Sequence, residues 1–211
     1  MKKKNFLLCI LIIFAANVDI YAQTLYSTDY YSKNKKVVSF GIKAGGQISA
    51  VNKIHSNSEK RFPGVLAGVT VQIPLQKSEN CRLFFAPELL YSQEGEKNNN
   101  TNNVVKEQFF QDYLAHFILL KGYLGNNNIL FAEFGPKLSY MINHKNKEID
   151  LNDSDKYDFG LCFGGGINPG KNDNFEIGAR LYLGLIDIYP GVNAKNYNMS
   201  GAVTFTYLFG M

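Results

Sequence analysis

The segment NNNILFAEFGPKLSYMINH, residues 126–144, places two opposite charges within an otherwise apolar sequence. Glu133 and Lys137 lie four positions apart, and most of their neighbours favour β-strands. Residues an even number of positions apart share one face of a strand, so these two side chains can form an ion pair. Phe134 and Leu138 would then occupy the opposite, apolar face. Such a segment suits a soluble sheet with its charges in water, or a membrane barrel with its charges inside.

Serine, histidine and carboxylate side chains could form a nucleophilic site, in which a base activates the hydroxyl group. His55 and His144 lie in predicted loops, whereas Ser92, Glu94 and Ser139 lie near predicted strand ends. No pair of these residues has the spacing of a recognisable motif, and only convergence in space would establish a triad. We therefore predict no enzyme activity and no catalytic residue. A lipid-modifying enzyme of the outer membrane is the alternative.

Two further segments resemble ligand-binding loops but lack a required residue. Residues 165–172, GGINPGKN, have Asn172 where a phosphate-binding loop needs serine or threonine. Residues 150–158, DLNDSDKYD, space carboxylates as a calcium loop does but lack the glycine at its bend. Cys81 and Cys162 lack metal-ligand spacing; we expect two unpaired thiols, with a disulfide as the alternative. We predict no cofactor and no bound metal.

Residues 1–22 have the pattern of a cleaved secretory signal peptide. Three lysines precede an apolar stretch at 6–16, which is too short to span a membrane, and Ala22 stands at the expected cleavage site. The mature chain would begin at Gln23, with residues 23–37 as a periplasmic tail. Of 22 basic and 18 acidic residues in the whole chain, 19 and 17 lie after this leader. This near balance gives no basis for binding nucleic acid.

The mature chain alternates apolar and polar residues with the period of β-strands. Short and long polar connections alternate between the strands, as in barrels of bacterial outer membranes. Only a closed barrel can cross a lipid bilayer with strands, because lipid cannot satisfy an open sheet edge. We therefore predict an all-β fold, an eight-stranded antiparallel up-and-down transmembrane β-barrel, over residues 38–211. The predicted strands are 38–50, 64–75, 82–93, 112–124, 128–142, 157–167, 174–186 and 197–209.

In this barrel the apolar face of each strand meets lipid and the charged face fills the lumen. Eight strands leave an interior just wide enough for side chains. A balanced set of charges inside would pair, which is how buried charge becomes tolerable. A soluble lipocalin-like barrel in the periplasm, with apolar residues inside around a ligand, is the alternative. The predicted lumen charge network consists of Lys43, Glu88, Lys121, Glu133, Lys137, Asp158, Glu176 and Arg180.

Aromatic residues near the strand ends predict two girdles at the membrane interfaces. His116 falls in the lipid-facing series of its strand. The predicted girdles are Tyr91, Tyr113, Tyr140, Tyr157 and Tyr197 at the outer ends, and Phe84, Tyr123, Phe175, Tyr207 and Phe209 at the inner ends.

The segments FGIKAGGQIS, FAPELLYSQEGEK, DYLAHFILLKGYLG, LFAEFGPKLSYMI and DFGLCFGGGI resemble successive strands of the PorT family of Bacteroidota outer-membrane barrels. The resemblance covers about residues 38–209. Ala115, His116 and Phe117 depart from the family pattern, and Gly210 and Met211 follow the last aromatic residue.

The resemblance implies a location in the cell outer membrane and a connection to protein secretion. We expect a barrel with a plugged polar lumen that is a structural or interaction component of the envelope. Its expected surroundings are outer-membrane lipid, its expected partners are envelope or secretion-complex proteins, and the barrel itself is expected to be monomeric.

Overall fold

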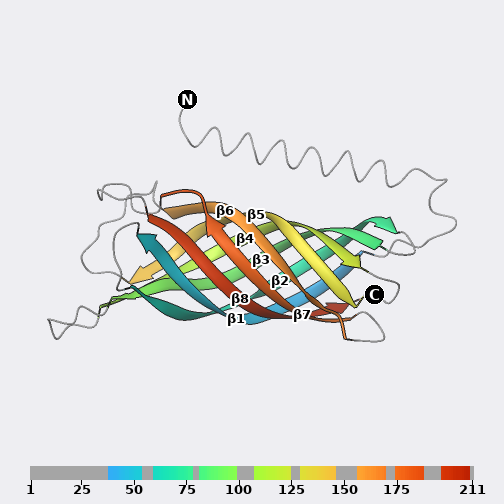
Figure 1. Ribbon diagram of the computed structural model, residues 1–211, viewed down its shortest axis with the longest axis horizontal. Helices are drawn as coiled ribbons and strands as arrows, with labels where there is room; N and C mark the ends of the chain where they lie inside the picture. The colour runs from blue at the N-terminus through green and yellow to red at the C-terminus, as the bar shows by residue number, and fades with distance from the viewer. Residues whose placement is uncertain are drawn as a thin grey trace, which may run out of the picture. The chain divides into compact units, whose positions relative to one another are not determined.

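The computed structural model describes residues 38–53, 59–77, 81–98, 107–124, 129–145, 156–169, 174–187 and 196–209. These residues form eight antiparallel strands in sequence order, and β1 pairs with β8 to close a barrel (Figure 1). The strands are β1 (Ser39–Lys53), β2 (Glu59–Lys77), β3 (Cys81–Asn98), β4 (Glu107–Leu124), β5 (Leu130–Lys145), β6 (Tyr157–Ile167), β7 (Phe175–Gly184) and β8 (Asn196–Phe209). The predicted fold class is confirmed. Within the described segments, no helix is long and apolar enough to cross a membrane. The predicted signal peptide and periplasmic tail lie outside them.

The two ends of the barrel differ in the strand ends that they contain. The terminus end contains Ser39, where β1 begins, and Phe209, where β8 ends. The loop end contains the opposite strand ends, where β1 leads to β2, β3 to β4, β5 to β6 and β7 to β8. In outer-membrane barrels the end with the longer connections faces the exterior.

Three strands extend five residues further at the loop end than the sequence predicted, and β1 and β5 extend three residues further. β2 begins at Glu59 rather than at residue 64, β3 continues to Asn98 rather than 93, and β4 begins at Glu107 rather than 112. Glu59 pairs with Asn98, which in turn pairs with Glu107. These extensions are rich in charged and amide side chains, so they lack the apolar alternation by which a strand is recognised in the sequence.

The strict alternation of short and long connections holds only in part. At the loop end the connections include 99–106, 146–156 and 185–195, whereas 78–80 lies at the terminus end. The β1–β2 connection covers only 54–58, because both strands continue beyond their predicted ends. The expectation of a long connection there is wrong.

Side chains alternate between the outer wall and the lumen along each strand. On β2, Val65 and Val69 are more than half exposed, whereas Thr70 is buried. On β7, Leu181 is 64% exposed and its neighbour Arg180 is 5% exposed. The apolar residues therefore face outward, and the lipocalin-like alternative, which needs them inside, is wrong.

The aromatic girdles form from part of the predicted set. Tyr140 and Tyr157 contact each other on the outer wall near the loop end, with ring centroids 5.2 Å apart. Tyr207 and Phe209 do the same near the terminus end, at 5.0 Å. Phe84, Tyr113 and Tyr123 are instead buried in the lumen, so their assignment to the girdles is wrong. Each of them lies an even number of positions from an inward-facing charge on its own strand, and this parity decides its direction.

Candidate functional site

The lumen is the candidate functional site, because charged side chains from many strands meet there. All eight residues of the predicted network are buried, each at most 5% exposed. They form two groups along the barrel. The central cluster consists of Lys43, Glu88, Lys121, Glu133, Glu176 and Arg180. The loop-end cluster consists of Gln47, Ser92, Glu94, Lys137, Asp158 and Asn198.

Arg180 connects three strands across the lumen. Its Nη1 and Nη2 atoms donate to the two carboxylate oxygens of Glu88 on β3, at 2.5 and 2.8 Å. Its Nε atom donates to Glu133 on β5. Lys43 on β1 donates to the same Glu88 carboxylate. The planar guanidinium suits this forked contact, which fixes both distance and direction between the strands.

A glycine in β6 makes room for the contact between Arg180 and Glu133. Gly164 lies between these residues in the register of β5, β6 and β7. A Cβ atom on Gly164 would lie 2.7 Å from Oε1 of Glu133 and 3.0 Å from Cγ of Arg180. The absence of a side chain therefore lets the two long side chains meet over the strand that separates them.

On its side nearest the terminus end, the central cluster contacts a group of aromatic rings. Lys121 Nζ lies 2.5 Å from Glu176 and 3.7 Å from Glu133. The Tyr123 hydroxyl also donates to Glu176. The Tyr123 ring packs against Phe84 and Phe131, with centroids 5.4 and 5.9 Å away. These rings fill the lumen between the central cluster and the terminus end.

The loop-end cluster is organised around Glu94, which the sequence analysis did not place in the lumen. Ser92 donates to Glu94 at 2.6 Å, and Lys137 and Asn198 also donate to this carboxylate. Asn198 further donates to Asp158 at 3.2 Å. The predicted third strand ended at residue 93. Had it been extended, the even spacing from Glu88 would have placed Glu94 inside.

Among the described residues that were considered for catalysis, the structure brings one pair into contact. Ser92 and Glu94 are in contact, but both are buried within the loop-end cluster. Ser139 is buried and faces the lumen from β5, whereas His116 lies on the outer wall between Leu89 and Leu138. His55 and the side chain of His144 lie outside the described part of the chain.

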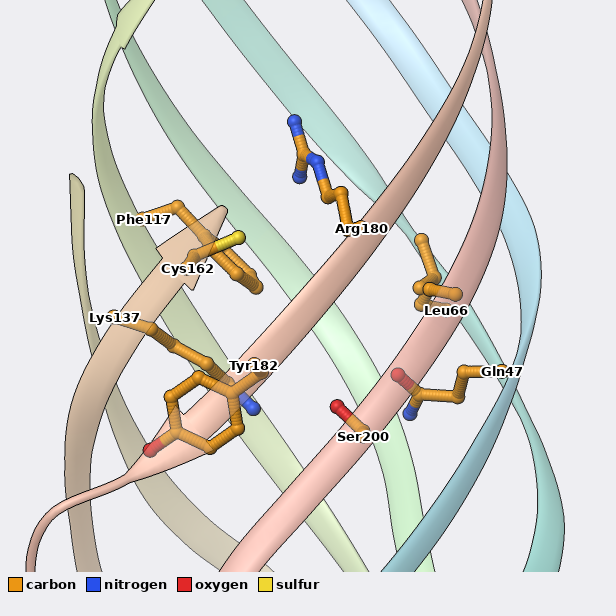
Figure 2. Close-up of a pocket in the computed structure, with 9 residues that line it drawn as sticks. Gln47, Leu66, Phe117, Lys137, Cys162, Arg180, Tyr182 and Ser200 are labelled. Carbon is orange, nitrogen blue, oxygen red and sulfur yellow. The ribbon is translucent and has the colours of Figure 1, made fainter. Parts of the chain in front are cut away.

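A small cavity lies between the two clusters. It is about 20 Å³ for the centre of a water molecule, room for roughly one water. Figure 2 shows Phe117 and Cys162 on one side of it, Leu66 and Gln47 on another, and Tyr182 beside Lys137. Cys162 is an unpaired, buried thiol, and the side chain of Cys81 is outside the described part. Among the described residues, no group of three or more His, Cys, Asp or Glu could hold a metal ion.

Comparison with known proteins adds a family and a set of distant structures. Residues 21–189 match the family described as outer membrane protein beta-barrel domain. No curated protein matches the sequence.

Three solved structures illustrate the likeness. The attachment invasion locus protein Ail of Yersinia pestis is 12% identical, with a TM-score of 0.43 over 82% of this chain and 99% of that chain. OprG from Pseudomonas aeruginosa is 11% identical, with a TM-score of 0.42 over 83% and 98%. The outer membrane enzyme PagL is 12% identical, with a TM-score of 0.48 over 78% and 98%.

Proposed function

Because the chain belongs to the outer membrane protein β-barrel family, we propose that it acts as a plugged, non-catalytic barrel that supports interactions in the envelope. The family places the protein in the outer membrane. The observation that carries the proposal is the contact of Arg180 with Glu88 and Glu133, which ties β7 to β3 and β5 through the middle of the lumen. Eight-stranded barrels are filled by side chains, whereas aqueous channels need about 16 strands.

The proposal that the barrel is non-catalytic rests on Ser92, whose hydroxyl is buried and hydrogen-bonded within the lumen. Ser92 is 2% exposed, and its hydroxyl donates to Glu94, whose carboxylate also binds Lys137. A lipid substrate in the outer leaflet would have to pass the barrel wall to reach this serine. His116 lies on the opposite side of that wall, so it cannot act as its base.

Interactions would then fall to the segments that the barrel holds at its ends. The connections 99–106 and 146–155 follow β3 and β5 at the loop end of the barrel. Their sequences are polar, with many asparagines, lysines and carboxylates. Partners would be other envelope proteins, met by a monomeric barrel surrounded by outer-membrane lipid. A place in the PorT family and a link to secretion rest on the sequence resemblance and stay predictions.

Site-specific photocrosslinking in cells tests the interaction. A photoreactive amino acid would be placed within 99–106, within 146–155 and, as a control, at Leu181, which faces lipid and is 64% exposed. We expect defined protein adducts from the connections and none from position 181. If neither 99–106 nor 146–155 gave protein adducts, an interaction role for these connections would be contradicted.

Planar-bilayer recording of the purified barrel tests the plug separately. We expect no discrete conductance steps, because ion pairs and rings fill the lumen. Stable single-channel openings in the wild-type protein would contradict a plugged barrel.

A further inference from the structure

Three polar side chains lie side by side on the outer wall at the loop end, and we call Gln93, Asp112 and Asn143 the outer-wall patch. Asp112 on β4 pairs in register with Gln93 on β3 and with Asn143 on β5. Gln93 lies between two lumen-facing residues of β3, so its side chain faces outward. The Asp112 carboxylate accepts hydrogen bonds from the Tyr91 hydroxyl at 2.7 Å and from the Asn143 amide at 3.1 Å. These donors fix its orientation, and each carboxylate oxygen can accept a further hydrogen bond.

A β-bulge brings Asn143 to this face of the wall. Tyr113 pairs with Met141 and Asp112 with Asn143, so β5 has one additional residue, Ile142, between the two pairs. Met141 is buried, and without the bulge Asn143, two positions further, would also face the lumen. Instead, Ile142 and Asn143 are both exposed. Bulges often redirect a side chain next to a functional site, and this one adds an amide to the outer-wall patch.

Aromatic residues follow the outer-wall patch toward the middle of the wall. Tyr91, Leu114 and Tyr140 form the next row in the register of β3, β4 and β5. Both tyrosines are partly exposed on the outer wall, and Tyr140 contacts Tyr157 on β6. Tyrosine suits the boundary of a membrane because its ring is apolar and its hydroxyl is polar. The patch therefore lies on the polar side of this boundary, at the end of the barrel that faces the exterior.

The row beyond the tyrosines contains His116, an exposed imidazole between Leu89 and Leu138. Hydrocarbon chains offer no hydrogen-bond acceptor, so an ionisable side chain on this surface is costly and indicates a function. His116 is four positions from Asp112 on the same face of β4, which in a tilted strand spans roughly 10 Å of membrane depth. This depth is comparable with the distance from a sugar headgroup to the carbonyl groups of its acyl chains. One lipid could therefore contact both residues.

We propose that this face of β3, β4 and β5 binds a glycolipid of the outer leaflet. Sugar hydroxyls both donate and accept hydrogen bonds, which suits a carboxylate between two amides, and the C–H face of a sugar ring packs on the tyrosine rings. His116 donates to an acyl-linkage carbonyl, and the acyl chains lie along the leucines. The Asp112 carboxylate repels an anionic headgroup. A free sugar would leave His116 without a partner. The site depends on the outer-membrane location and not on a protein partner.

Native mass spectrometry of the full barrel tests the site, in an oxyethylene detergent that has no sugar headgroup. Monoglucosyl-diacylglycerol is titrated as the probe, and phosphatidylethanolamine with the same acyl chains is the comparison. We expect a saturable complex with a Kd about tenfold lower for the glucosyl lipid, the difference that one or two hydrogen bonds to a charged group supply. Glucose alone should not displace the bound lipid. Equal Kd values for the two lipids, or displacement by glucose at the concentrations of the lipid, would overturn the proposal.

Three variants locate the binding. Asp112→Ala should abolish the preference for the glucosyl lipid. His116→Leu should raise the Kd for this lipid several-fold, and because leucine suits a lipid-facing wall, this variant keeps the test decisive if Asp112→Ala fails to fold. Leu181→Ala on β7 is the control, since Leu181 faces lipid on a different part of the wall, and it should leave both Kd values unchanged. A preference that survives in His116→Leu without any change in Kd would overturn the assigned site.

Discussion

The central and loop-end clusters lie in one lumen but neutralise charge in different ways. In the central cluster Arg180 makes a forked contact with Glu88, and each carboxylate has a cation within ion-pair distance. In the loop-end cluster Lys137 forms an ion pair with Glu94 and none with Asp158, and Ser92 and Asn198 donate the other hydrogen bonds to these carboxylates. The central cluster has three cations for three carboxylates and a bidentate arginine contact, so the middle should be the more rigid part of the lumen. The loop end is held more weakly and is open to adjustment.

Arg180→Leu should have the largest effect. It removes the contacts to Glu88 and Glu133 and leaves buried carboxylates short of positive charge, which should lower the free energy of unfolding by about 5 kcal/mol. Urea unfolding in detergent, followed by circular dichroism, measures the change. Arg180→Lys, which keeps the charge but not the fork, should fall between this variant and the wild type. An unchanged midpoint for Arg180→Leu would contradict the assignment of the strand faces.

Lys137→Met should cost less, about 3 kcal/mol, although it removes the ammonium group of the loop-end cluster. Ser92 and Asn198 still donate to Glu94, which limits the loss. The same unfolding measurement applies. Adding Glu94→Gln to the variant should restore part of the stability, because it removes the unpaired charge. A loss larger than that of Arg180→Leu would reverse the order of the two clusters.

Gly164→Ala should have the smallest effect of the three, about 2 kcal/mol, because its methyl group must displace Glu133 and Arg180. Gly46→Ala is the matched control, since a Cβ there meets no atom within 4 Å. This control should leave the unfolding midpoint close to that of the wild type. Equal losses in both variants would show that glycine flexibility, rather than space for the ion pair, is what matters at position 164.

The sequence predicted the strands and the direction of the charged side chains because both depend on a period of two. Glu133 and Lys137 share a face in any strand, whichever strand lies beside it. The partners of these residues were less accessible. Arg180 meets Glu88 from a strand four positions away in the barrel, and this depends on strand tilt and stagger, which a single sequence does not contain.

The errors at the strand ends have a related cause. Glu94 lies in a part of β3 that continues beyond the apolar alternation, so nothing in the local pattern marks it as part of a strand. Tyr113 and Tyr123 were assigned by their position near strand ends, but an aromatic ring suits an interface or a lumen equally well. Their parity relative to Lys121 on the same strand was the signal that could have placed them inside.

The contact between Arg180 and Glu88 also limits the order of folding events. The two residues are 92 positions apart in the chain, and they meet only across the barrel interior. Until β8 has paired with β1, the charged face of the sheet has neither its ionic partners nor a closed wall to shield it from lipid. The growing sheet must therefore keep that face in water until closure, and ion pairing across the lumen should be among the last steps of assembly.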